Sequence, residues 1–195
     1  MIKSFKLFLE SNQTVTYEML SEIIQFRNNS LLSDYKFIHG EVDSLIIELG
    51  GDTDELCPVT TDEYKDFSIN VQNLISVVNS NPEFIEKVQK IYQEVESIME
   101  GFPKFYELED YFLELLDKNF NLQLTFKTNI FEINISNNFS DVKLDSSSYI
   151  ELVKTCSSIE NRLNSKYDCE IVDKSFTKQG ENNIVDIKFE LTKKF

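Results

Sequence analysis

Residues 120–135 read FNLQLTFKTNIFEINI, and this stretch decides the fold class. Its apolar residues alternate with polar ones on either side of Thr128-Asn129, at Phe120, Leu122, Leu124 and Phe126 and then at Phe131, Ile133 and Ile135. A period of two is typical of a strand with one buried face. The stretch therefore predicts two strands joined by a short hairpin turn.

Downstream of this hairpin, one helix and two more strands are expected. Ser146 to Ser148 are predicted to cap a helix that carries Tyr149, Leu152, Val153, Cys156, Ile159 and Leu163. Strands follow over Tyr167–Phe176 and Ile184–Leu191, joined by a turn that contains Gly180. The C-terminal part is thus a ββαββ unit, with an antiparallel sheet covered on one face by helix. Its predicted core comprises Leu122, Leu124, Ile133, Ile187 and Phe189.

Upstream of residue 120 the apolar residues recur every three or four positions, the pattern of helices with one buried face. Thr16 and Asn81 are the expected caps of two of these helices. The expected helices cover residues 3–10, a segment that begins at Thr16 and carries Met19 to Ile24, and then 33–49, 60–78, 82–98 and 104–118. The fold class is therefore α+β, with a helical portion at 1–119 and the ββαββ unit at 120–195, either as two domains or as one continuous domain.

The charge of the chain is unevenly distributed. The 195 residues carry a formal net charge of −15, and residues 1–119 hold 23 acidic and 9 basic side chains, against 11 and 10 in residues 120–195. A strongly acidic helical portion repels nucleic-acid phosphates, which argues against direct DNA or RNA binding. It favours instead a protein partner with a basic surface.

Five acids of the last predicted helix are the candidate partner-binding residues: Glu107, Glu109, Asp110, Glu114 and Asp117. Two interpretations stay open for them. They could form a solvated helix face, as acids at helical spacing commonly do. Alternatively, they could imitate phosphates and occupy the nucleic-acid groove of a basic protein.

No catalytic, metal or cofactor signature is found, and we predict a non-enzymatic protein without a cofactor. Cys57, Cys156 and Cys169 lack CxxC spacing, and His39 is the single histidine, so a four-ligand zinc site is not expected. The cysteines are predicted to be buried apolar residues in a reducing cytoplasm. With five glycines and no phosphate-binding loop motif, nucleotide binding is not expected either.

The segment Asp52–Glu63 has the acid spacing of a calcium-binding EF-hand loop at positions one, three and twelve. Leu56 stands where an oxygen ligand is needed, and Cys57 replaces the glycine of the turn. We therefore interpret it as a solvated acidic loop that ends in a Thr60–Glu63 capping box. The chain also lacks the roughly 20 consecutive apolar residues that cross a bilayer, and a soluble protein is expected.

The opening MIKSFKLFLES, residues 1–11, resembles the capsid-targeting leader of proteins from T-even-like tailed bacteriophages. In that family the leader ends in an apolar-x-Glu site that the prohead protease cuts before a small residue. The resemblance implies cleavage between Glu10 and Ser11, with Phe8 in the place where the best sites have Ile or Leu. A second match occurs at residues 98–101.

Together these observations predict a phage protein that acts by binding other proteins. It is expected in the virion, as a structural or internal delivered protein, or in the host cytoplasm. The alternative is an acidic inhibitor or immunity protein that caps a basic site on a nuclease or another host enzyme.

Overall fold

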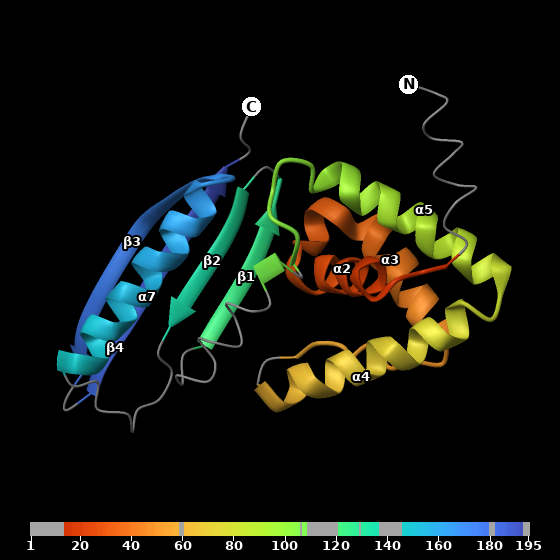
Figure 1. Ribbon diagram of the computed structural model, residues 1–195, viewed down its shortest axis with the longest axis horizontal. Coiled ribbons are helices and arrows are strands. Elements are labelled where there is room, and N and C mark those ends of the chain that lie inside the picture. The colour runs from red at the N-terminus through yellow and green to blue at the C-terminus, as the bar shows by residue number, and fades with distance from the viewer. Residues whose placement is uncertain are drawn as a thin grey trace. The chain divides into compact units, whose positions relative to one another are not determined.

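The structure is a computed structural model that describes residues 14–58, 61–105, 107–108, 121–128, 130–136, 146–179 and 182–192. The chain forms two compact units (Figure 1). Unit 1 contains the chain up to Asn28 together with Tyr35–Ile98, and unit 2 contains Asn29–Asp34 and the chain from Met99 onward. Unit 2 thus includes a short strip, Asn29–Asp34, that lies in the sequence between two parts of unit 1.

Unit 1 is formed by helices α2 (Tyr17–Asn29), α3 (Leu32–Glu48), α4 (Thr61–Val78) and α5 (Pro82–Ile98), except for the last residue of α2 and the first three residues of α3, which belong to unit 2. Two of the expected caps are confirmed. The Thr16 hydroxyl accepts a hydrogen bond from the backbone N–H of Met19 at 3.4 Å, and the Asn81 side chain accepts one from that of Glu83 at 3.0 Å. Tyr35, with φ of −129° and ψ of 29°, kinks α3 where the chain returns to unit 1.

The core of unit 1 is apolar and lies on the helix faces that the sequence predicts. Its most deeply buried side chains include Leu20, Ile23, Ile24, Phe26, Val42, Leu45, Phe67, Val71, Val88 and Val95. Burial of a side chain of this size stabilises a fold by about 1.5–3 kcal/mol. The apolar periodicity of α2 to α5 is therefore satisfied within the unit.

Unit 2 contains a four-stranded antiparallel sheet formed by β1 (Asn121–Lys127), β2 (Ile130–Ser136), β3 (Asp168–Gln179) and β4 (Asn182–Thr192). The strand order is β1-β2-β4-β3. The predicted hairpin is confirmed, because Phe126 pairs with Phe131 and Lys127 with Ile130. Thr128 in the turn has φ of 52°, as hairpin turns require of their first residue.

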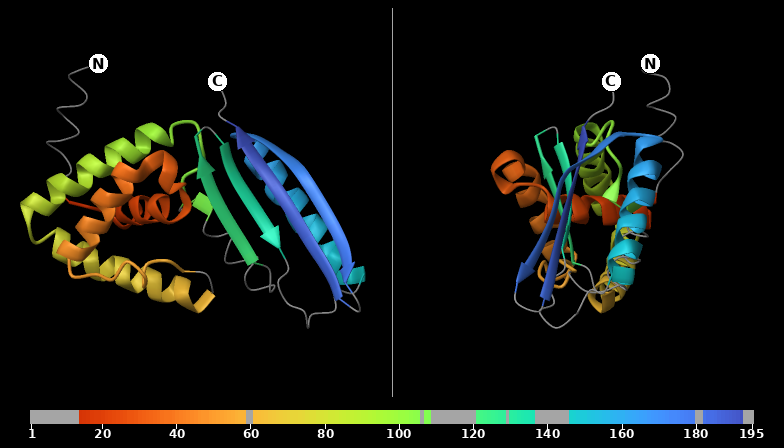
Figure 2. Two further views of the ribbon diagram at one scale, coloured as in Figure 1. Left: turned by 180° about the vertical axis from the view of Figure 1, so that it is seen from behind. Right: turned by 90° about the vertical axis from the view of Figure 1, so that its left-hand side faces the viewer.

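The two faces of the sheet differ in polarity. Helix α7 (Ser146–Asn164) lies along one face (Figures 1 and 2). The buried residues of unit 2 include Leu124, Phe126, Phe131, Ile133, Ile135, Ile187, Phe189, Leu191, Cys156, Ile159 and Leu163. The opposite face is polar, and Lys188 there binds Glu132 at 2.9 Å and Glu190 at 3.1 Å. The α+β class, with one sheet face covered by helix, is thus confirmed. One detail is corrected, since Ser146 to Ser148 form the first turn of α7 and do not precede it.

The strip Asn29–Asp34 lies against the outer edge of β1 within unit 2. Ser30 forms a parallel bridge with Phe126, and Leu31 donates a backbone hydrogen bond to the Phe126 carbonyl at 3.1 Å. The Thr128 hydroxyl donates to Asp34 Oδ2 at 3.1 Å. Phe126 also packs on Phe102, with ring centroids 5.2 Å apart. The strip therefore satisfies backbone groups that an open sheet edge would leave unpaired.

Several predictions fall on residues that the structure does not describe. They are the opening helix at 3–10, the cap Thr60, most of the helix expected at 104–118, the change of element type at 119–120 and the side chain of Leu122. In the described part of the chain, no helix has the length and apolar character needed to cross a membrane.

Candidate functional site

The connection from α3 to α4 begins with a tightly defined helix end. Gly50 has φ of 79°, its N–H bonds to the Ile47 carbonyl, and the N–H of Gly51 bonds to the Ile46 carbonyl at 2.9 Å. This pair of bonds is a Schellman motif, which favours glycine at the residue with positive φ. A Cβ on Gly51 would lie only 3.2 Å from Leu74 Cδ2, so this glycine lets the connection approach α4 closely.

The loop that follows is held by its own side chains. Asp52 Oδ1 accepts a hydrogen bond from the backbone N–H of Asp54 at 2.9 Å, which forms an Asx turn. Leu56 is 1% exposed and anchors the loop in the core, while its carbonyl accepts a bond from the Asn28 amide at 2.6 Å. The fifth position of the calcium-like pattern therefore points an aliphatic side chain inward.

Cys57 is exposed, which corrects the prediction that all three cysteines are buried; Cys156 and Cys169 are buried as expected. The Cys57 thiol donates to Asn28 Oδ1 at 3.1 Å and accepts from Arg27 Nη1 at 3.1 Å. Leu56 belongs to a turn that the Cys57 N–H closes on the Asp54 carbonyl at 3.3 Å, and the burial of the Leu56 side chain leaves that of Cys57 on the solvent side.

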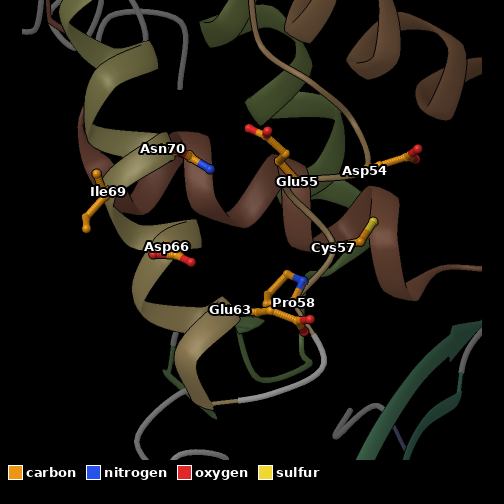
Figure 3. Close-up of a pocket in the computed structure, with 8 residues that line it drawn as sticks. All are labelled: Asp54, Glu55, Cys57, Pro58, Glu63, Asp66, Ile69 and Asn70. Atoms are coloured by element: carbon orange, nitrogen blue, oxygen red, sulfur yellow. The ribbon is translucent and has the colours of Figure 1, made fainter.

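An acidic pocket of about 380 Å³ lies between this loop and α4 in unit 1 (Figure 3). In the close-up, Asp66 and Asn70 of α4 point toward the loop, and Glu55 of the loop points back toward α4. The residues that line the acidic pocket are Asp54, Glu55, Cys57, Pro58, Glu63, Asp66, Ile69 and Asn70. A second hollow of about 360 Å³ adjoins it and shares Glu55 and Asn70.

The electrostatics of the acidic pocket follow from the charge of unit 1. Residues 14–28, 35–58 and 61–98 carry 15 acidic and five basic side chains, a formal net charge of −10. Arg27 binds Asp43 at 2.8 Å, Lys87 binds Glu48 at 2.8 Å, and Lys90 lies near Glu41 at 3.7 Å. Among the described residues, Asp54, Glu55 and Asp66 form no ion pair. The pocket therefore combines four carboxylates with the apolar surfaces of Pro58 and Ile69, which suits a cationic side chain with an aliphatic stem.

His39 lies half-buried on α3, close to Arg27 and Asp43. Burial lowers its pKa, the positive charge of Arg27 lowers it further, and Asp43 partly opposes both effects. The neutral form of His39 is thus favoured at pH 7, as expected for an ordinary, partly exposed histidine.

Of the acids predicted as partner-binding residues, the structure describes Glu107 alone. Glu107 is exposed, and its Oε2 accepts a hydrogen bond from the Tyr167 hydroxyl at 3.0 Å. The other four acids, Glu109, Asp110, Glu114 and Asp117, lie outside the described residues, as do Glu10 and Ser11 of the expected processing site.

Sequence reasoning identified the acidic loop but missed the α4 side of the pocket. Asp66 and Asn70 follow Glu63 by three and seven positions, which places all three on one helix face. That spacing was the available signal. Within the residues that the structure covers, no group of three or more His, Cys, Asp or Glu side chains is placed to hold a metal ion.

Comparison with known proteins gives no further lead, because the chain matches no protein-family model and no curated protein.

Proposed function

We propose that this protein acts by binding another protein, and that the acidic surface of unit 1 meets a basic surface on that partner. The observation that carries the proposal is the set of carboxylates at the acidic pocket, where Asp54, Glu55 and Asp66 are held in no ion pair among the described residues. Lysine or arginine side chains of a partner supply the missing cations. Complementary charge of this kind raises association rates and weakens with salt, because exposed charges are screened beyond about 8–10 Å.

The test measures binding of a fluorescein-labelled nine-arginine peptide to the full chain by fluorescence anisotropy, at about 50 and about 300 mM salt. One variant carries Asp54→Lys, Glu55→Lys and Asp66→Lys. We expect it to bind at least about tenfold more weakly than the wild type, because its pocket no longer offers carboxylates. Circular dichroism checks that the exposed substitutions leave the helices intact.

A second variant with the same change in net charge is the matched control. It carries Glu107→Lys, Glu109→Lys and Glu114→Lys in the region first predicted to bind. Equal losses in both variants would show that overall charge, and not the acidic pocket, governs binding. Unchanged binding in both, or binding that ignores salt, would overturn the proposed function.

Two settings suit a protein of this kind. In the first, it is a virion-associated or internal protein of a tailed phage, which rests on the resemblance of residues 1–11. Mass spectrometry of purified particles tests this setting, and a mature N-terminus at Ser11 is the expected result.

In the second setting, the protein is an inhibitor or immunity protein that caps a basic site on a nuclease or another host enzyme, and the acid surplus of unit 1 favours this setting. Loss of enzyme activity on adding the protein, with recovery in the Asp54/Glu55/Asp66 variant, distinguishes it.

A further inference from the structure

One face of α3 in unit 1 is exposed although it carries two large apolar side chains. Phe37 is 68% and Ile47 is 66% exposed, while Ile38, Val42 and Leu45 of the same helix are buried. We define the α3 outer face as Lys36, Phe37, Gly40, Ser44, Ile47 and Glu48. A groove of about 820 Å³ runs beside it, lined by α3 residues between Lys36 and Glu48 and by Lys87 of α5.

The spacing on this face is that of a helix–helix contact. Phe37, Gly40, Ser44 and Ile47 follow each other at intervals of three, four and three residues. Such a repeat forms a continuous seam along one side of a helix, as the core positions of coiled coils do. The inner face of α3 packs in the core of unit 1 through Ile38, Val42 and Leu45, whereas Phe37 and Ile47 of the outer face stay exposed.

Gly40 has no packing role among the residues that the structure describes. It lies inside α3, where glycine weakens a helix relative to alanine, and a Cβ built there meets nothing within 4 Å. Its neighbour one turn on, Ser44, turns its hydroxyl back to the Gly40 carbonyl at 2.8 Å. Because Gly40 carries no side chain, another helix can approach the backbone of α3 closely at the middle of the outer face.

The α3 outer face is complementary to itself in the antiparallel direction. When two copies of α3 run antiparallel about a two-fold axis at the level of Val42, Phe37 faces Ile47 of the second copy, and Gly40 faces Ser44. Lys36 then faces Glu48, which in the single chain accepts a bond from Lys87 and is still 48% exposed. Apolar, small and oppositely charged residues are thus each matched, as an isologous interface requires.

We propose that a second copy of this chain docks on the α3 outer face, with the two helices antiparallel. The 13 residues from Lys36 to Glu48 span about 20 Å, so the contact belongs to the small, weak class of interfaces. A dissociation constant on the order of 10–100 µM is expected. Each unit 1 is strongly negative, so salt strengthens this association by screening, whereas binding of a basic partner weakens with salt.

Disulfide trapping tests the register directly. In a Cys57→Ser background, Phe37→Cys and Ile47→Cys variants are oxidised separately and as a mixture. Antiparallel pairing brings position 37 of one copy to position 47 of the other, but holds two copies of position 37 about 15 Å apart along the axis, too far for a disulfide. A linked dimer in the mixture alone is the expected result. Linkage in neither case, or equal linkage in the separate samples, would overturn the proposal.

Sedimentation velocity of the full chain provides a test that needs no cross-link. The dimer fraction should rise with protein concentration and with salt. Phe37→Lys is expected to weaken dimerisation at least about tenfold, while Ile150→Lys, at a residue 53% exposed on α7, should leave it unchanged. Gly40→Leu should raise the melting temperature and still weaken the dimer. A wild type that stays monomeric at millimolar concentration, or equal effects of Phe37→Lys and Ile150→Lys, would contradict the α3 interface.

Discussion

Asn79 holds Val15 by both ends of its side-chain amide. Its Oδ1 accepts a hydrogen bond from the Val15 N–H at 2.7 Å, and its Nδ2 donates to the Val15 carbonyl at 2.9 Å. These bonds tie Val15, two residues before α2, to Asn79, the residue after α4, 64 positions along the chain. The amide of one side chain thus satisfies both the backbone donor and the backbone acceptor of Val15.

Asn79→Ala should destabilise unit 1 by about 1–3 kcal/mol, because it removes two hydrogen bonds from the nearly buried backbone of Val15. Urea unfolding followed by circular dichroism measures the change. Gln72→Ala on the exposed side of α4 is the control and should change stability by less than about 0.5 kcal/mol. Equal effects of the two substitutions would mean that the amide does not hold the helices together.

Ile187→Asp should unfold unit 2. Ile187 is 4% exposed and pairs with Ile135 on the apolar face of the sheet, so an ionised carboxylate there is removed from solvent. The expected loss is roughly 4–5 kcal/mol, comparable with the whole stability of a marginal domain. Val172→Asp, at the bulge of β3 where the side chain is 43% exposed, is the matched control. A folded Ile187→Asp protein with normal amide dispersion by NMR would contradict the described core.

The three thiols should react in two classes. Cys57 is exposed and should react quickly with a disulfide reagent, whereas Cys156 and Cys169 are buried. Burial, together with the charge of Glu160, raises the pKa of Cys169 to about 11, so its reactive thiolate is scarce at pH 8. One thiol should titrate in the folded protein and three in denaturant. Fast reaction of Cys57→Ser in its folded state would count against this assignment.

The elevated pKa of Cys169 also predicts that alkaline pH lowers the stability of the folded protein. Between pH 9 and pH 11 the thiol ionises in the unfolded chain but stays protonated in the folded one, so the unfolded state binds fewer protons. Stability contributed by Cys169 is therefore present below pH 9 and falls as the pH rises through this window. Cys169→Ala should show a shallower alkaline loss of stability than the wild type.

Lys188→Met should weaken the sheet by about 0.2–1 kcal/mol. Glu132 lies directly opposite Glu190, and Lys188 binds both carboxylates. These hydrogen bonds raise the pKa of Lys188. Without the ammonium group the two carboxylates, which lie directly opposite each other on neighbouring strands, repel each other. Lys154→Met on the exposed side of α7 should be neutral in the same urea titrations.

Most of the elements were predictable because local patterns determine them. The alternation of Phe131, Ile133 and Ile135, and the caps at Thr16 and Asn81, require only neighbouring residues. What could not be predicted depends on distant pairs. The outward position of Cys57 accompanies the burial of Leu56, whose carbonyl accepts a bond from the distant Asn28, and the acidic pocket forms where the loop meets Asp66 of α4. The periodicity of a single segment does not predict such contacts between residues that are distant in the sequence.

The strip Asn29–Asp34 sets an order of events during synthesis. Its hydrogen-bond partners belong to β1 and the following turn, and Asp34 precedes Thr128 by 94 residues. At about 5–20 residues per second, a ribosome needs on the order of 5–20 seconds to deliver them. The helices of unit 1 are complete before then. Until these residues are synthesised, the strip Asn29–Asp34 lacks its hydrogen-bond partners in β1 and the turn. In a protein truncated before residue 121, these bonds cannot form.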